Sequence, residues 1–597
     1  MYKKSMWFTI LTILVLVGLL SSGCAKETVA PTIEESVTVP SETESAEIVP
    51  TEETAPTEET EKSQIVVVIA EDPPSFNATV NASGFDALVM ELVMLGLADL
   101  DEEGNAYPEL AEELPTVENG GVIIDEENGT MDVTWKLRQD IQWSDGVPVT
   151  AEDVVFTYDA VVDPEYGFWI NGIDYVDGVE KIDDYTAVVH YNAIYPGYLT
   201  QFGGYLMAIW PAHYCDADQG FTQWDCGFQP LSNGPYLLKE WVQNDHLTFE
   251  RNPNYYEAGK PAIDEIVVKI IPDEAVRKQM LINGDADLDM WTPENVIVEL
   301  KDYSDVVEVS LSPVDRWVMR IFFNLAAKGT TDPEATPHPI VSDVRVRRAI
   351  RMAIDSATIS EEFFRGYADL VWTEFFRPPY NVCDIPQPVY DPEAAAALLE
   401  EAGWTDQDGD GVRECHGCTT GAEEGYPMEM EFITYSEYGE ALDLTQEFIA
   451  EKLGEIGFKL SISRVEGTVL WDTSENGGIE QSGNFDIDIW DDGYSGNDPT
   501  DFLWGYYYSE AAIPDYGYNY GRYINPQVDE LIDQSYTLDD ELRKDIFCQM
   551  AKILDEDLPE LLLFTTVDAN AHSTRLQGVR SNANEIVTWN VADWTLK

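Results

Sequence analysis

Basic residues are scarce in this sequence, where 34 Lys and Arg stand against 112 Asp and Glu and give a formal net charge of −78. A field of that sign repels nucleic-acid phosphates, so it argues against a nucleic-acid partner. The acidity is typical of a solvated surface, as in proteins from a saline habitat. Attraction of cationic ligands or of Ca²⁺ is the alternative.

Long apolar runs and common catalytic motifs are also missing. After residue 20 no stretch holds 18 consecutive apolar residues, so no further segment is expected to span a membrane. G-x-S-x-G, H-E-x-x-H and a P-loop are absent, and no two of the six His lie four residues apart. We therefore expect a protein that is not an enzyme, with an exported hydrolase as the weaker alternative.

The N-terminus has the features of an export signal. Lys3 and Lys4 precede an apolar run of 14 residues over 7–20, too short for a comfortable membrane span. Leu20-Ser-Ser-Gly-Cys24 then resembles a bacterial lipobox, with its Leu one position early. We predict a lipoprotein signal peptide over 1–24, lipidation of Cys24, and a protein anchored on the periplasmic or cell-surface face of the cell membrane.

A flexible tether is predicted over residues 25–63. This stretch consists mainly of Thr, Glu, Pro, Ser and Ala, and it includes the near-repeat TEETAPTEET. Such a composition cannot bury enough apolar surface to order itself. The segment would connect the membrane anchor to the folded body.

Six of the seven Cys remain once Cys24 is set aside, an even number in an exported chain. Cys215 and Cys226 are near each other in sequence, as are Cys415 and Cys418, so these four are our candidates for disulfides. The connectivity stays open at this point. A zinc half-site at 415–418 is the alternative, but the sequence has no second C-x-x-C to complete it.

The body mixes strand and helix signals without regular alternation. Residues 64–70 form a β-branched run that predicts a buried strand, and 85–97 predict a helix. Helical patterns recur over 151–161, 273–282, 343–354, 392–401, 442–456 and 539–554. This mixture favours an α/β protein with lobes over a barrel or a solenoid.

One long segment, residues 135–158, resembles the signature of the family 5 solute-binding proteins, which bind oligopeptides, dipeptides and nickel. Within it Asp145-Gly146 predicts a turn, and Thr150 with Asp153 predicts a capped helix start. Further segments follow in the order of that family, at 95–111, 233–256, 284–288, 323–324, 343–350 and 394–404.

The resemblance implies a clamshell of the periplasmic-binding-protein type, with two lobes, a hinge and an extra domain on the first lobe. It places the first lobe at 64–98, 183–285 and 556–597, the extra domain at 99–182, and the second lobe at 286–555. It also implies a monomeric binding protein that delivers a small solute to ABC permease subunits and requires no cofactor. The expected solute is an oligopeptide, with an oligosaccharide as the second choice and a sensor lipoprotein as the alternative role.

The same resemblance suggests which residues face the solute. In peptide binders an Asp four residues before a Pro pairs with the amino terminus of the peptide. Ser495 holds that position before Pro499, so Asp491, Asp492 or Asp498 would have to replace it. The candidate ligand-binding residues are Asn81, Phe85, Asn324, Trp490, Asp492, Tyr494, Ser495, Asp498 and Trp504. Solvated loop residues and core packing are the alternatives.

Residues 406–414 resemble the start of a Ca²⁺-binding loop. Asp406, Asp408 and Asp410 alternate along the chain, and Gly411 follows at the position of the sharp turn. The twelfth position is Gly417 instead of Glu, so the loop is incomplete. We expect Ca²⁺ as an optional ligand of the three Asp, with an acidic β-turn as the alternative.

Overall fold

The structure is a computed structural model, and it describes residues 62–597 except 82, 166, 169, 171, 205–206, 313–315, 495 and 567. Asn81 is described by its backbone alone. The predictions about the signal peptide, Cys24 and nearly all of the tether lie outside the described residues and stay predictions. Within the described part, no helix has both the length and the apolar character that a membrane span needs.

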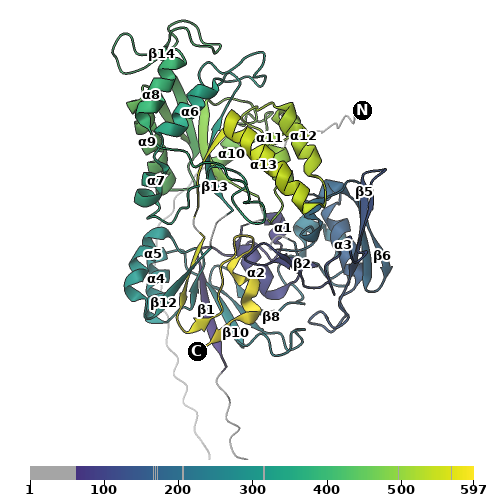
Figure 1. The fold of residues 1–597 in the computed structure, drawn as a ribbon. Coiled ribbons are helices and arrows are strands. Elements are labelled where there is room, and N and C mark those ends of the chain that lie inside the picture. Colours follow the sequence, from purple (N-terminus) through teal and green to yellow (C-terminus); the bar gives the residue numbers. More distant parts are fainter. Residues whose placement is uncertain are drawn as a thin grey trace, which may run out of the picture. The chain divides into compact units, whose positions relative to one another are not determined.

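A seven-stranded sheet forms the centre of the first lobe (Figure 1). Its order is β12-β20-β11-β1-β10-β9-β8. The strands are β1 Gln64–Ile69, β8 Tyr236–Val242, β9 His246–Arg251, β10 Glu265–Ile270, β11 Leu288–Asp289, β12 Val307–Leu311 and β20 Ala569–Ser573. β1 runs parallel to β10 and β11, which confirms the buried strand predicted at 64–70.

Helices cover both faces of this sheet, which explains why β1 is apolar along its length. Ile65, Val67 and Ile69 share a core with α2 (Phe85–Val93). Val68 packs with residues of α4 (Glu274–Asn283) and α5 (Glu294–Leu300) on the opposite face.

A five-stranded sheet forms the centre of the second lobe, in the order β17-β16-β18-β13-β19. Its strands are β13 Val318–Phe323, β16 Glu429–Tyr435, β17 Lys459–Val465, β18 Ile487–Asp492 and β19 Glu560–Thr565. One face packs on α6 Val344–Ala353, α7 Ser356–Phe363, α8 Pro392–Glu401 and α9 Glu440–Glu455. The other packs on α10 Gly467–Leu470, α11 Thr500–Tyr507, α12 Pro526–Ser535 and α13 Asp540–Asp557.

A third sheet forms a side domain with α3 (Ala151–Val161). Its order is β4-β5-β7-β6, with β4 Val122–Asp125, β5 Thr130–Lys136, β6 Val176–Asp183 and β7 Thr186–Tyr191. Thr150 and Asp153 form the reciprocal capping contacts at the start of α3, as predicted. Trp135 and Trp143 share one core with Leu88 of α2, so the side domain packs on the first lobe.

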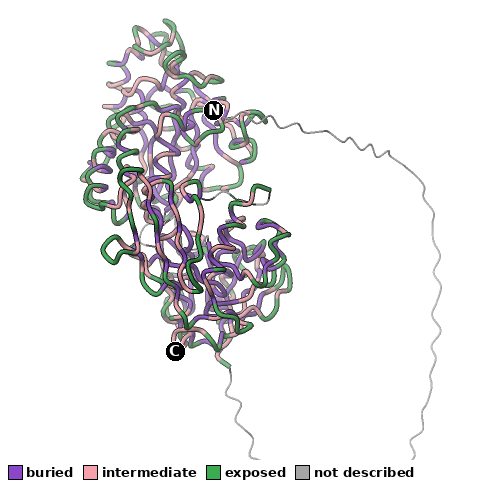
Figure 2. The backbone as a smooth tube through the Cα atoms, turned by 90° about the vertical axis from the view of Figure 1, so that its right-hand side faces the viewer, coloured by how far each residue is buried: buried purple, intermediate pink, exposed green. Residues whose placement is uncertain are grey.

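Shorter elements complete the described part. They are α1 Ala78–Asn81, β2 Ala98–Leu100, β3 Ala106–Pro108, β14 Trp404–Thr405, β15 Glu414–Cys415, β21 Leu576–Gln577, β22 Thr595–Leu596, and the 3-10 helices Ile173–Tyr175, Pro196–Leu199, Ala217–Gln219, Phe221–Gln223, Asp225–Gly227, Lys301–Tyr303, Ser509–Ala512 and Val587–Asp593. Figure 2 shows the buried residues inside each lobe and the exposed ones along its outer turns and helix faces.

Among the described strands, the chain passes from the first large sheet to the second between β12 and β13, and it returns between β19 and β20. The predicted start of the second lobe at 286 is wrong, because β11 and β12 pair within the first sheet. Its predicted end at 555 is also too early, because β19 still belongs to the second sheet. The side domain also continues beyond its predicted end at 182, because β7 starts at Thr186 and belongs to its sheet.

Candidate functional site at the end of strand β18

The carboxyl end of β18 lies beside the first crossing of the chain. Asp492, the last residue of β18, is opposite Val318, the first residue of β13 after that crossing. A Cβ atom on Gly493 would lie 1.9 Å from the carbonyl oxygen of Arg316, so only glycine fits there. The segment 490–504, in which the family resemblance places several solute contacts, is therefore held at the boundary between the lobes.

Asp492 is half-buried in a polar environment. Its carboxylate accepts hydrogen bonds from the Tyr506 hydroxyl and from the Gly493 amide. Burial raises the pKa of Asp492 to about 7, although the positive charge of Arg320 opposes that rise. Arg320 itself is fully buried, with its Nη1 atom 2.7 Å from Glu374 and 3.3 Å from Glu560.

Tryptophan 490 is more recessed than a stacking platform should be. Trp490 is 6% exposed, its ring stacks on Phe322 at 4.5 Å, and its Nε1 atom donates to Glu480. Trp471 packs edge-on against it at 5.4 Å and is 36% exposed. Trp471, which was not among the predicted candidates, therefore offers the more accessible ring.

The other aromatic candidates have packing partners inside the second lobe. Tyr494 is buried, and its ring lies 4.1 Å from the Arg377 guanidinium. Trp504 is half-buried and stacks on Tyr508 at 5.8 Å.

Two predicted polar candidates are taken up by internal contacts. Asn324 is fully buried; its amide donates to the backbone carbonyls of Gly483 and Phe485 and accepts from Ala326. These contacts hold Asn324 inside the second lobe, and its role in solute binding stays a prediction. Asp498 pairs with Arg543 at 2.6 Å within the second lobe.

On the first lobe, Phe85 begins α2 and packs edge-on against Trp291, with ring centroids 5.2 Å apart. Trp291 is 37% exposed. The side chain of Asn81 and all of Ser495 lie outside the described residues, so their predicted roles stay predictions.

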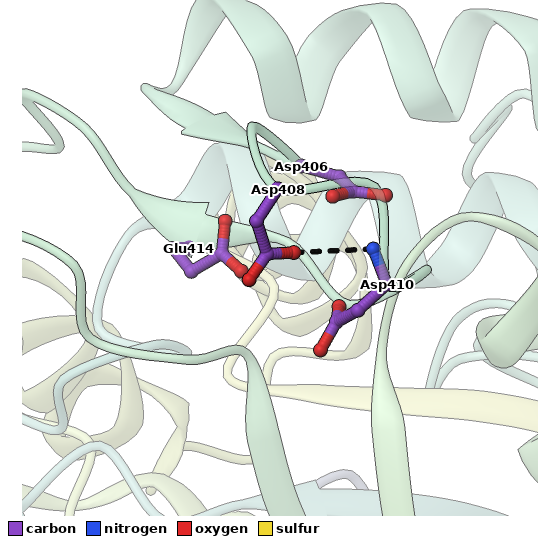
Figure 3. Close-up of side chains that lie close together, drawn as sticks. All are labelled: Asp406, Asp408, Asp410 and Glu414. Atoms are coloured by element: carbon purple, nitrogen blue, oxygen red, sulfur yellow. Dashed lines mark hydrogen bonds between the residues drawn. The ribbon is translucent and has the colours of Figure 1, made fainter.

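Four carboxylates lie close together in the loop formed by residues 406–414 (Figure 3). Asp406, Asp408, Asp410 and Glu414 each offer an oxygen within 4.8 Å of the others. Asp406 also accepts hydrogen bonds from the Gly409 and Gly411 amides, which shapes the turn. Oxygen ligands of this kind suit Ca²⁺. The sequence prediction had omitted Glu414, which lies at the ninth position of the loop, and calcium binding stays a prediction.

All six Cys of the described part are paired. The structure joins Cys215 to Cys226 and Cys415 to Cys418. It also joins Cys383 to Cys548, which are 165 residues apart.

Arg320 was not among the predicted candidates, although its position in the sequence carries a signal. Arg320 is the single charged residue in the strand VMRIFF, all of whose residues are buried. A charge inside such a strand indicates a buried ionic partner. Tyr506 and Trp471 had no comparable signal, because their roles depend on contacts made across the fold.

Residues 105–513 match the family described as "Bacterial extracellular solute-binding proteins, family 5 Middle". The chain belongs to this family. The oligopeptide-binding protein AppA of Bacillus subtilis is 23% identical over 548 residues, which cover 89% of this chain and 91% of the relative. The periplasmic oligopeptide-binding protein OppA of Salmonella typhimurium is 25% identical over 505 residues, with coverages of 79% and 82%.

Solved structures of the same fold cover most of the chain. HbpA2 from Haemophilus parasuis has a TM-score of 0.72 at 20% identity and covers 89% of this chain and 100% of that chain. NikZ from Campylobacter jejuni, solved in complex with Ni(L-His), has a TM-score of 0.68 at 21% identity, with coverages of 90% and 100%. These likenesses confirm the predicted clamshell fold of α/β lobes.

Proposed function

We propose that this chain is the substrate-binding subunit of an ABC importer, which encloses a peptide or another small solute between its lobes and delivers it to a membrane permease. The carrying observation is the family match over 105–513, together with oligopeptide-binding relatives that align along most of their length. A solute that contacts both lobes shifts the protein toward its closed form by its differential affinity for that form.

Asp491 and Asp492 are the proposed anchors for a cationic group of the solute, such as the amino terminus of a peptide. Both are half-buried at the boundary between the lobes, whereas Asp498 is paired with Arg543. The Arg320 guanidinium donates to the backbone carbonyl of Asp492 at 2.9 Å, but two other carboxylates, Glu374 and Glu560, share its charge. An ammonium group beside Asp492 would favour the ionised form of its carboxyl and lower the pKa that burial raises to about 7.

A solute with flat apolar faces would stack on the more exposed rings. Trp471 is 36% exposed and Tyr518 is 47% exposed, whereas Trp490 is recessed. An oligosaccharide would therefore stack on Trp471 before Trp490.

The test is a thermal-shift screen of the purified protein against tripeptides, oligosaccharides, polyamines and metal ions. A solute that binds only the folded form raises the apparent stability by mass action, by about 2.7 kcal/mol at a concentration one hundred times Kd. We expect a shift with tripeptides that D491N/D492N reduces and D533N, an exposed control on α12, does not. Shifts with oligosaccharides alone would reassign the solute, and silence from every class would contradict solute capture.

Membrane anchoring at Cys24 is a separate proposal that rests on the lipobox-like sequence. Mass spectrometry of the N-terminal peptide from the native host should show a lipid on Cys24, and C24S should leave the membrane fraction. An unmodified Cys24 would contradict it. Solute uptake that depends on a permease encoded beside this chain would separate the importer from a sensor lipoprotein.

A further inference from the structure

A cluster of tyrosine hydroxyls joins the second lobe to the side domain through one carboxylate. The Asp501 side chain, in the first turn of α11, accepts from the Tyr195 hydroxyl at 2.9 Å and from the Tyr536 hydroxyl at 3.3 Å. Tyr195 follows β7 of the side domain, whereas Tyr536 follows α12 of the second lobe. Tyr175 of the side domain completes the cluster, with its hydroxyl 2.8 Å from that of Tyr536.

The rings of this cluster also pack on one another. Tyr175 and Tyr195 stack at 5.2 Å, and Tyr175 lies 5.5 Å from Tyr536. The contact therefore combines aromatic packing with hydrogen bonds to a charged acceptor, which are stronger than those between neutral groups.

A second contact, made by the loop that leads into α11, links the second lobe to the first lobe. The Asn497 side chain donates to the carbonyl oxygen of Gly104 at 2.8 Å. Gly104 lies in the turn between β2 and β3 and has a φ of +80°, which suits glycine. Residues 496–501 thus touch the other half of the molecule at both of their ends.

Two buried arginines hold this loop from inside the second lobe. The Nη2 atom of Arg377 donates to the carbonyl of Tyr494 at 2.7 Å and lies 3.4 Å from that of Gly496. Arg543 donates to the Asp498 carboxylate at 2.6 Å and to the Thr500 hydroxyl at 2.9 Å. The loop is therefore fixed to its own lobe and presents Asn497 and Asp501 outward in a set geometry.

We propose that residues 496–501 form a closure latch, which holds the second lobe against the side domain in the absence of solute and has Asp501 as its anchoring group. The latch rests on the lobe motion of the proposed function but needs no solute contact. It lets the protein sample the closed form before capture, so a solute has less free energy to supply on closing.

The latch also makes closure sensitive to pH. Closing moves Asp501 out of water, and that burial raises its pKa from 3.8 to about 6, with the nearby negative charge of Asp498 adding to the rise. Asp174 of the side domain faces Asp501 too, and the three tyrosines keep their protons because burial raises their pKa values. The closed form therefore binds a proton more tightly than the open form.

The direction of the pH dependence of closure follows from proton linkage. The buried charge of Asp501 opposes closure above pH 6, and this cost is relieved as the pH falls toward 4. Lowering the pH from 7.5 to 5 should raise the closed-to-open ratio by up to about tenfold, the limit reached when all of the burial of Asp501 comes from closure.

The experiment measures the distance between spin labels at I182C and V389C in the full-length protein, purified without added solute. These positions are exposed and lie in the side domain and the second lobe. We expect a short-distance population that Y195F/Y536F lowers about tenfold or more relative to the long-distance one, because it removes the Tyr195–Asp501 and Tyr175–Tyr536 hydrogen bonds, which join the side domain to the second lobe. D501N should keep a short-distance population but remove its pH dependence.

The matched control is Y508F, because the Tyr508 hydroxyl donates to Asp533 within the second lobe alone. It should leave the distances unchanged. The latch is overturned if Y195F/Y536F keeps the parent distribution, or if the parent shows the long distance alone. Should D501N fail to fold, Y195F and Y536F separately still test the contact. No solute is used, so a failed solute screen would not alter this result.

Discussion

Replacing Arg320 with Met tests whether the second lobe depends on one buried cation. Arg320 is fully buried on β13, and its guanidinium is shared by Glu374 and Glu560. Met fills similar volume but leaves both carboxylates without a counter-charge in an apolar environment. Breaking a buried ion pair in this way costs about 3–5 kcal/mol.

Hydrogen exchange of the amides of β13 and β18 measures this cost within the second lobe. Since 1.36 kcal/mol corresponds to tenfold, R320M should exchange about 10² to 10⁴ times faster. The matched control is R464M, on β17 of the same sheet, whose pairs with Asp443 and Glu447 are partly exposed. A pair of that kind contributes less than about 1 kcal/mol.

The stability penalty of R320M should also change with pH in a direction that can be predicted. Burial raises the pKa of Glu560 to about 7 even though Arg320 lowers it, so loss of Arg320 raises that pKa further. A raised carboxyl pKa destabilises the folded form at high pH, and protonation relieves that as the pH falls through the folded value. The R320M penalty should therefore be smaller at pH 5 than at pH 8. Equal exchange in R320M and R464M, or a penalty that grows on acidification, would refute the reasoning.

Three further outcomes are expected. C383S/C548S should lower the stability of the second lobe by about 2–5 kcal/mol in a denaturant titration, because that disulfide closes a long loop; an unchanged midpoint would count against it. T150A should cost about 0.5–2 kcal/mol through loss of the α3 cap, and amide exchange in α3 would reveal an error if it stayed at the parent rate. Calorimetry with Ca²⁺ should give heat that D408N abolishes, and no heat with the parent would end the calcium prediction.

Local patterns in the sequence predicted the elements well. The strand at 64–70 and the capped helix at 151–161 formed as expected, because their signals are local: a β-branched run and a reciprocal cap. The family resemblance predicted the two lobes and the extra domain, but it placed the crossings wrongly. β11 and β12 are short strands with weak patterns; β11 joins the first sheet through β1 and β20, and β12 joins it through β20.

The candidate site was harder to predict, because the role of a side chain depends on what faces it in three dimensions. Asn324 and Asp498 have the chemistry of ligand contacts, yet both bind partners within the protein. Asn324 donates to two backbone carbonyls, and Asp498 pairs with Arg543. Trp471 lies in an unremarkable stretch, and its exposure follows from the packing of Trp490 beneath it. Asp501 has no local signal in the sequence, because its two tyrosine partners lie 35 and 306 residues away.

The position of β20 has a consequence for how the chain acquires its structure during synthesis and export. β20 lies between β11 and β12, so the central sheet of the first lobe waits for residues 569–573, whereas the whole second sheet comes from the contiguous stretch 318–565. The second lobe can therefore mature first, while β12 has no strand partner and β11 has only β1. A chain that stops before residue 569 would carry an intact second lobe beside an interrupted first one, which is the kind of product that quality-control proteases remove.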